Sequence, residues 1–194
     1  SEVTNISVFS LGNTKDVIAD NRLLADVAIV DSDLTLTMPK RLTAATGVDA
    51  LTHAVEAYLS KNSSPTTDGL AIHAVKLIGE SLVDAVKDGN HLEAREKMSQ
   101  ASYIAGLAFF NAGVAGVHAL AYPLGGLYNI PHGQANAVLL PYVMNYIKDS
   151  CEDKMSDLAV AFNPKLYQHS KEKRKEEFIN ELFQLIKDID LLEK

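Results

Sequence analysis

The sequence predicts a mainly α-helical fold, in which a helical bundle follows a few β-strands. In the first 37 residues, the β-branched segments "VTNISVF" and "DVAIVD" predict strands, and "LGNTK" predicts a turn. After Pro39 the pattern becomes helical, and we expect a short helix over 40–45 and a second helix over about 48–60. Because two or three strands alone make a poor sheet, we expect them to complete a sheet formed with other sequence.

The remaining sequence predicts further helices. "SSPTTDGLAIHAVKLIGESLVDAVKDG" predicts a loop and a long amphipathic helix ending near Gly89, and "HLEAREKMSQASYIAGLAFFNAG" predicts another helix. "GVAGVHALAYPLGGLYNIPHGQANAVLLPYVMNYIKD" predicts a helix, an irregular Gly/Pro loop and a second helix. From about residue 171 the tail is amphipathic, with one apolar face formed by Phe178, Leu182, Phe183 and Ile186.

Composition narrows the class of protein. The 194 residues are 47% hydrophobic, enough for one good core, and the net charge of −7 argues against nucleic acid or an anionic membrane as partner. No apolar run is long enough to span a bilayer, and the N-terminus lacks the pattern of a signal peptide. The single cysteine, Cys151, cannot form an internal disulfide. We therefore expect a cytoplasmic protein.

The segment "GVDALTHAVEAY" places Asp49 four residues before His53, on one face of the predicted helix. Two further histidines occupy the most unusual stretch: His118 in an apolar helical context, and His132 between a proline and a glycine. A Gly/Pro loop between two helices can bring these two imidazoles together, facing Asp49 and His53. One carboxylate oxygen and three imidazole nitrogens suit a divalent first-row metal ion.

Other interpretations remain open at this stage. Asp49 and His53 can form a local pair, and histidines on apolar faces are often hydrogen-bonded core residues. A metal-dependent hydrolase, acting through a water molecule on the same cluster, and a non-catalytic helical module are the two alternative functions. The other three histidines are interpreted as ordinary helix or surface residues: His73, His91 and His169.

Two long motifs carry a resemblance to a known family. "GVDALTHAVEAY" and "GVHALAYPLGGLYNIPHGQANAVLLPYVMNY" closely resemble the two signature regions of the iron-containing, group III alcohol dehydrogenases. The resemblance extends over "LLADVAIVDSDLTLTMPKRLTAATGVDALTHAVEAYLS" and covers about residues 1–150 well and the tail loosely. It implies a helical, dehydroquinate-synthase-like metal-binding domain over 38–194, incomplete at its C-terminus. It also implies that 1–37 are strands left from an N-terminal α/β nucleotide-binding domain.

The resemblance also implies a reaction and its site. Hydride would pass between a primary or secondary alcohol, or the corresponding aldehyde or ketone, and NAD or NADP. The family's metal ligands match Asp49, His53, His118 and His132, and the metal is expected to be Fe(II), with Zn(II) as the alternative. Two further positions match residues that contact the nicotinamide cofactor: Thr4 and Lys15. Small alcohols or aldehydes are the implied substrates, and the full-length protein is expected to form a homo-oligomer.

Two features depart from the family pattern. Tyr122 stands where many members carry a second histidine, and a phenol with an ordinary pKa near 10 is a poor proton shuttle at neutral pH. A weak catalytic role for Tyr122 and simple packing beside Pro123 both remain open. The chain also lacks the family's glycine-rich phosphate loop, and the pair Gly125–Gly126 is placed in the metal-site loop. We therefore interpret the chain as a fragment, which alone should bind metal at best and turn over poorly or not at all.

Overall fold

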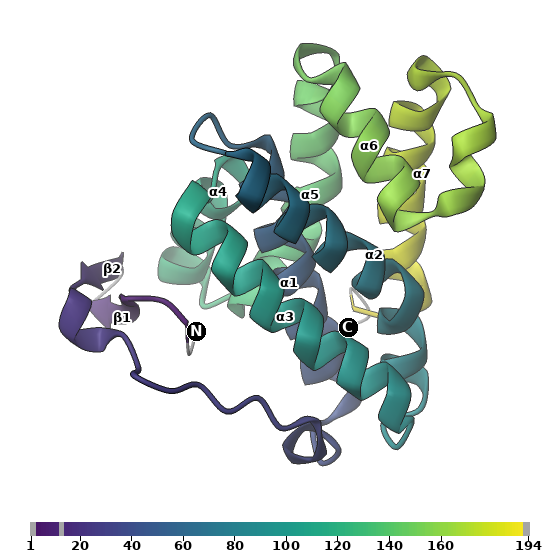
Figure 1. Cartoon of the computed structure of the whole chain (residues 1–194). Coiled ribbons are helices and arrows are strands. Elements are labelled where there is room, and N and C mark those ends of the chain that lie inside the picture. Colours follow the sequence, from purple (N-terminus) through teal and green to yellow (C-terminus); the bar gives the residue numbers. More distant parts are fainter. Residues whose placement is uncertain (1–2, 12–13, 192–194) are drawn as a thin grey trace.

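The computed structural model describes residues 3–11 and 14–191, and it is mainly helical, as the sequence predicts (Figure 1). At the N-terminal end, β1 (Ile6–Leu11) pairs in antiparallel fashion with β2 (Thr14–Ala19). The register runs from Ile6 opposite Ala19 to Leu11 opposite Thr14, so the chain reverses within the predicted turn "LGNTK". Residues 12 and 13 of that turn lie outside the described part of the chain.

The predicted strand "DVAIVD", residues 26–31, is wrong. This segment is an irregular connection that follows a short 3-10 helix, Asn21–Leu23, and precedes another, Ser32–Thr35. Val27 and Ile29 are 76% and 86% exposed. A strand needs a neighbouring strand for its backbone hydrogen bonds, and the only sheet among the described residues is the β1–β2 pair. Segment 26–31 therefore stays irregular despite its β-branched residues, because no strand lies beside it among the described residues.

The expectation of two helices between 40 and 60 is also wrong, because α1 runs unbroken from Lys40 to Leu59. Gly47 lies inside this helix, where it is buried against α2 (Pro65–Lys87). A Cβ atom added at Gly47 would lie 2.2 Å from Cδ1 of Leu82 on α2. The glycine therefore serves close packing between two helices rather than a break in one of them.

The next two helices begin and end where the sequence predicts. The N-cap of α2 is Ser64, whose hydroxyl accepts from the backbone N–H of Thr67 while the Thr67 side chain accepts from Ser64, a reciprocal capping box. The next helix, α3 (Leu92–Ala112), starts after His91, whose Nδ1 accepts from the N–H of Ala94 at 3.2 Å. His91 is an exposed residue at the start of α3.

The predicted irregular loop within 116–137 is much shorter than expected. α4 (Gly116–Tyr128) continues through Pro123, Gly125 and Gly126, so that glycine pair lies in a helix rather than in a loop. Proline removes one helical hydrogen bond and glycine weakens helices, but α4 packs along α5 (His132–Ile147), and this contact outweighs the local preference. Only residues 129–131 connect the two helices.

Two more helices follow α5 in the described part of the chain. α6 (Glu152–Phe162), which the sequence reading did not predict, packs against α2 and α7. α7 (Lys171–Asp188) matches the predicted amphipathic tail, and it buries Phe178, Leu182 and Ile186. Short 3-10 helices precede α6 (Lys148–Ser150) and follow it (Pro164–Gln168).

The first helix occupies the centre of the bundle, where α1 packs against α2, α3 and α5 (Figure 1). Small buried residues on α1, including Ala44, Ala54 and Ala57, let the neighbouring helices approach closely. The face of α1 that carries Asp49 and His53 is turned toward α4 and α5, and the site described below lies there.

Among residues 3–11 and 14–191, no single helix is both long and apolar enough to cross a membrane. By length and composition alone, α3 and α4 together meet that requirement as a broken pair, with a bend of 103° between them.

Candidate metal centre

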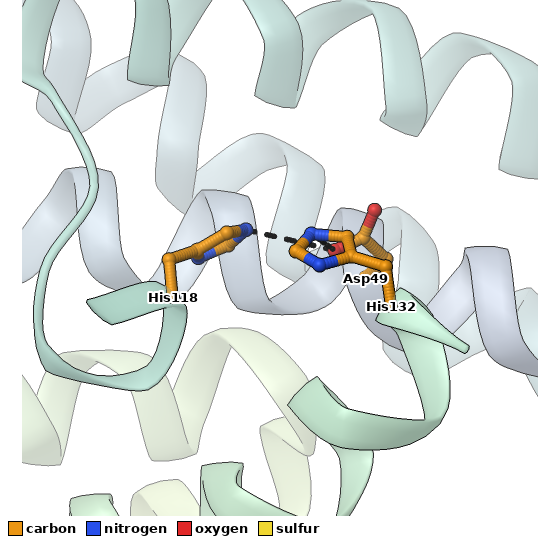
Figure 2. Close-up of side chains that lie close together, drawn as sticks. All are labelled: Asp49, His118 and His132. Carbon is orange, nitrogen blue, oxygen red and sulfur yellow. Dashed lines mark ion pairs between the residues drawn. The ribbon is translucent and has the colours of Figure 1, made fainter. Parts of the chain in front are cut away.

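Three helices bring an acid and two imidazoles together. Asp49 comes from α1, His118 from the first turn of α4, and His132 is the first residue of α5. Figure 2 shows the imidazole of His118 pointing toward the Asp49 carboxylate, with the His132 ring in front of that carboxylate in this view. Oδ1 of Asp49 lies 3.6 Å from Nε2 of His118 and 3.4 Å from Nε2 of His132. One ligand atom from each residue lies within 4.8 Å of the others, a separation that suits one shared metal ion.

The backbone at the start of α5 explains this convergence. Asn129 ends α4 in the left-handed conformation, with a φ of 53°, so the chain turns sharply before Pro131 and enters α5 at His132. Gly133 then allows α5 to approach the backbone of α1. A Cβ atom at Gly133 would lie 2.3 Å from the carbonyl oxygen of Ala45, which is one turn before Asp49.

The fourth residue predicted for the site, His53, lies beside this cluster. The His53 ring stacks on the rings of both His118 and Phe109. The centroid distances are 4.5 Å to His118 and 4.3 Å to Phe109. The structure therefore brings all four predicted residues to one place, with Asp49, His118 and His132 as the compact set.

A buried glutamate orients His118. Glu56, seven residues after Asp49 on α1, is 1% exposed, and its Oε2 lies 2.5 Å from Nδ1 of His118. Its other oxygen, Oε1, accepts from the backbone N–H of Val117 at 2.6 Å. A proton on Nδ1 that is held by Glu56 leaves Nε2 as the nitrogen that faces Asp49, a carboxylate–histidine arrangement typical of metal sites.

The electrostatic environment favours an ionised Asp49 beside a neutral His53. Burial opposes ionisation of Asp49, but the neighbouring imidazoles outweigh it and lower its pKa to about 2. Burial is the main reason that the pKa of His53 falls to about 4, although Asp49 opposes the change. For His118, burial is outweighed by the neighbouring carboxylates of Asp49 and Glu56, and its pKa rises to about 9. A metal ion would therefore displace a proton from His118.

The donor set fits a first-row divalent metal. Imidazole nitrogens with one carboxylate oxygen are ligands that Fe(II) and Zn(II) both accept. The ionised Asp49 supplies the negative charge, and the contact between Glu56 and His118 supplies the second layer of hydrogen bonding. The residues present therefore fit the metal ion that the family resemblance implies.

A cavity of about 390 Å³ opens beside the cluster. Its walls come from the loop between α4 and α5, from α4 and from β1, and they include Tyr122, His132 and Val8. The Tyr122 ring stacks on that of His132 at 5.9 Å between centroids. Burial and the charges of Asp49 and Glu56 raise the pKa of Tyr122, so this phenol is a hydrogen-bond donor rather than a base at neutral pH.

The predicted cofactor residues lie at the N-terminal end. Thr4 is buried immediately before β1, and Lys15 belongs to β2, although its side chain lies outside the part of the chain that is described. Their contact with a nicotinamide cofactor stays a prediction. His73 is exposed on α2, and His169 follows the 3-10 helix Pro164–Gln168, both away from the cluster.

The sequence reading missed two residues of this site, Glu56 and Asn136. Glu56 follows Asp49 by seven positions and His53 by three, so it shares their face of α1. Asn136 follows His132 by four positions on α5, and its amide contacts the cluster. In both cases the helical spacing from a predicted ligand was the available signal.

Solved structures of alcohol dehydrogenases share this fold. A 1,3-propanediol oxidoreductase structure is 45% identical with a TM-score of 0.93, covering 98% of this chain and 50% of that one. An iron-containing alcohol dehydrogenase from Thermotoga maritima is 34% identical with a TM-score of 0.83, covering 100% of this chain and 48% of that one. The fold is therefore that of a helical domain of the alcohol dehydrogenases.

The sequence comparisons narrow this class to one family. Residues 43–194 match the Fe-containing alcohol dehydrogenase family, C-terminal. This chain belongs to that family, as the two sequence motifs predict. Long-chain-alcohol dehydrogenase 1 of Geobacillus thermodenitrificans is 66% identical over 158 residues, which are 81% of this chain and 40% of that protein. 1,3-Propanediol dehydrogenase of Citrobacter freundii is 52% identical over 161 residues, 82% of this chain and 42% of that protein. The chain thus spans less than half the length of these relatives.

Proposed function

We propose that this chain is the metal-binding part of an NAD(P)-dependent alcohol dehydrogenase. The observation that carries the proposal is the convergence of Asp49 Oδ1 with the Nε2 atoms of His118 and His132. Asp49, His53, His118 and His132 would hold Fe(II), with Zn(II) as the alternative. When bound, the ion would polarise the oxygen of an alcohol or carbonyl substrate and favour hydride transfer to or from the nicotinamide.

Other residues of the chain would orient a metal ligand and line the substrate cavity. Glu56 keeps the imidazole of His118 oriented, and Tyr122 lines the cavity in which a primary or secondary alcohol, or its aldehyde or ketone, would lie. The substrates of the relatives, a long-chain alcohol and 1,3-propanediol by their names, support a small-molecule alcohol for this chain too. Residues 1–37 are proposed to belong to a nucleotide-binding domain. Thr4 and Lys15 are proposed to contact NAD or NADP. The full-length protein is proposed to be a homo-oligomer.

The proposed dehydrogenase fits the site better than a metal-dependent hydrolase. Such hydrolases commonly hold two metals among several carboxylates. Here Glu56, the second carboxylate near the cluster, already uses one oxygen for the N–H of Val117 and the other for His118. Asp49 is therefore the one carboxylate that faces the cluster with an oxygen available to an ion, within the described part of the chain.

Metal content tests the proposal. We would measure iron and zinc per chain by plasma mass spectrometry, on protein purified without air or chelator, for the wild type, His132→Ala and His73→Ala. His132 is exposed at a helix start, so its replacement is compatible with folding, and His73 is the matched control on α2. The proposal expects about one metal per chain, lost in His132→Ala and kept in His73→Ala. Equal metal content in all three proteins would refute the site.

A further inference from the structure

The side-chain amide of Asn136 lies at the point where the three candidate ligands meet. Asn136 is fully buried on α5, one turn after His132. Its Nδ2 lies 2.5 Å from Oδ1 of Asp49, 3.2 Å from Nε2 of His132 and 3.3 Å from Nε2 of His118. This nitrogen contacts one atom of each of the three candidate ligands, so its position calls for a physical explanation.

The nitrogen and the oxygen of the Asn136 amide differ in their hydrogen bonding. The nitrogen has the Asp49 carboxylate as acceptor, whereas Oδ1 is buried and has no hydrogen-bond partner among the described residues. Turning the amide over would place Oδ1 against the carboxylate oxygen, which repels it. The charge of Asp49 therefore holds the N–H groups in the centre of the cluster, at the cost of an unsatisfied carbonyl oxygen.

A metal ion and this amide nitrogen cannot share the centre. Zinc bound to imidazole nitrogen or carboxylate oxygen lies about 2.0–2.2 Å from each ligand atom. An ion bound to Asp49, His118 and His132 would therefore overlap Nδ2 of Asn136, which lies 2.5–3.3 Å from the same three atoms. The side chain has to leave the centre before an ion enters it.

We propose that Asn136 stands in for the ion in the metal-free protein. Its partly positive amide N–H groups partner the Asp49 carboxylate beside the two imidazoles, and ion binding displaces the amide. This inference rests on the metal site proposed above. It assigns Asn136 a positioning role in the metal-free state only, whereas a purely structural asparagine would stabilise the metal-free and the metal-loaded protein equally.

The experiment compares the thermal unfolding midpoint of Asn136→Ala with that of the wild type, each in excess chelator and in excess Zn²⁺. Asn163→Ala is the matched control, because the Asn163 amide donates to a carboxylate, Glu181, at 2.6 Å and lies away from the cluster. If Asn136→Ala does not fold, Asn136→Ser replaces it, since a serine hydroxyl does not reach Asp49.

The proposal expects Asn136→Ala to lower the midpoint mainly in chelator, by about 2–4 °C, so that its zinc-induced rise exceeds that of the wild type. Zinc affinity, measured by titration calorimetry, should stay the same or increase. An equal drop of the midpoint in chelator and in zinc, the result expected for Asn163→Ala, would overturn this inference. Weaker zinc binding would do so too. Neither result would count against the proposed metal site. If zinc fails to raise the midpoint of the wild type, the proposed metal site is wrong and the inference falls with it.

Discussion

Oε2 of Glu56 and Nδ1 of His118 lie 2.5 Å apart, and both side chains are buried. The two residues are 62 positions apart in sequence, on α1 and α4. Through this contact, the helix that provides Asp49 also sets the orientation of an imidazole on another helix. Metal-site histidines are commonly fixed in this way by a carboxylate on the nitrogen that does not face the ion.

Glu56→Gln is therefore expected to weaken zinc binding by about 10- to 100-fold without removing any ligand. The Gln amide can satisfy either the N–H of Val117 or Nδ1–H of His118 with its oxygen, but its NH₂ group opposes the other donor. Titration calorimetry with Zn²⁺ measures the change. Glu181→Gln is the control, since Glu181 accepts a hydrogen bond from Asn163 on another face of the domain. An unchanged affinity in Glu56→Gln would show that the contact is not used to orient His118.

Gly133→Ala is expected to damage both stability and metal binding. Because the added Cβ would lie 2.3 Å from the carbonyl oxygen of Ala45, α5 must move away from α1, and His132 moves away from Asp49 with it. Such overpacking costs about 1–3 kcal/mol in the free energy of unfolding. The control is Gly69→Ala on α2, where nothing lies within 4 Å of the new Cβ and the change should stabilise by about 0.5–1 kcal/mol. Denaturant unfolding and metal content together check the prediction, which fails if both variants behave alike.

The sequence was sufficient to predict those features that depend on local spacing. The ends of α2, the end of α3 and the placement of Asp49 and His53 on one helix face all follow from residues a few positions apart. Family motifs then supplied the link to His118 and His132, which spacing alone left open. The partnership of Glu56 with His118 depends on how α1 and α4 pack, and nothing local in either motif indicates it.

The wrong predictions share one physical cause, the effect of tertiary contacts on a local preference. A break was expected between helices over 40–45 and about 48–60, but Gly47 lies within one helix and provides close contact with Leu82. Pro123 was expected in a loop, but packing against α5 keeps it in α4. The segment 26–31 has strand-forming residues but no strand beside it in the described structure. In the first two cases the deciding contact is with another helix, and in the third no neighbouring strand is present among the described residues.

Alkaline pH should reveal the buried phenol of Tyr58. Its hydroxyl donates to Oδ2 of Asp157 at 2.8 Å, and burial together with this hydrogen bond raises the pKa of Tyr58 above its ordinary value. Because the folded-state pKa exceeds that of the unfolded chain, the resulting stability is present below about pH 10 and is lost as pH rises through the folded-state value.

In a titration followed by phenolate absorbance, Tyr58→Phe should reduce the late part of the curve, to which Tyr122 also contributes. Asp157→Asn should shift the Tyr58 step to lower pH, because a negative charge is removed. A late part of the curve that Tyr58→Phe leaves unchanged would contradict the assignment.

Tyr122→Phe should keep the metal, because the phenol is outside the set of candidate ligands. Its ring stacks on His132, with centroids 5.9 Å apart, and the substitution preserves that contact while removing only the hydroxyl group. Metal content should stay at the wild-type level, and zinc affinity should change by less than about threefold, or about 0.7 kcal/mol. Metal analysis and titration calorimetry beside His132→Ala make the comparison. A loss of affinity approaching that of His132→Ala would place the Tyr122 hydroxyl in the metal site, whereas retention leaves it a role only at the cavity that it lines.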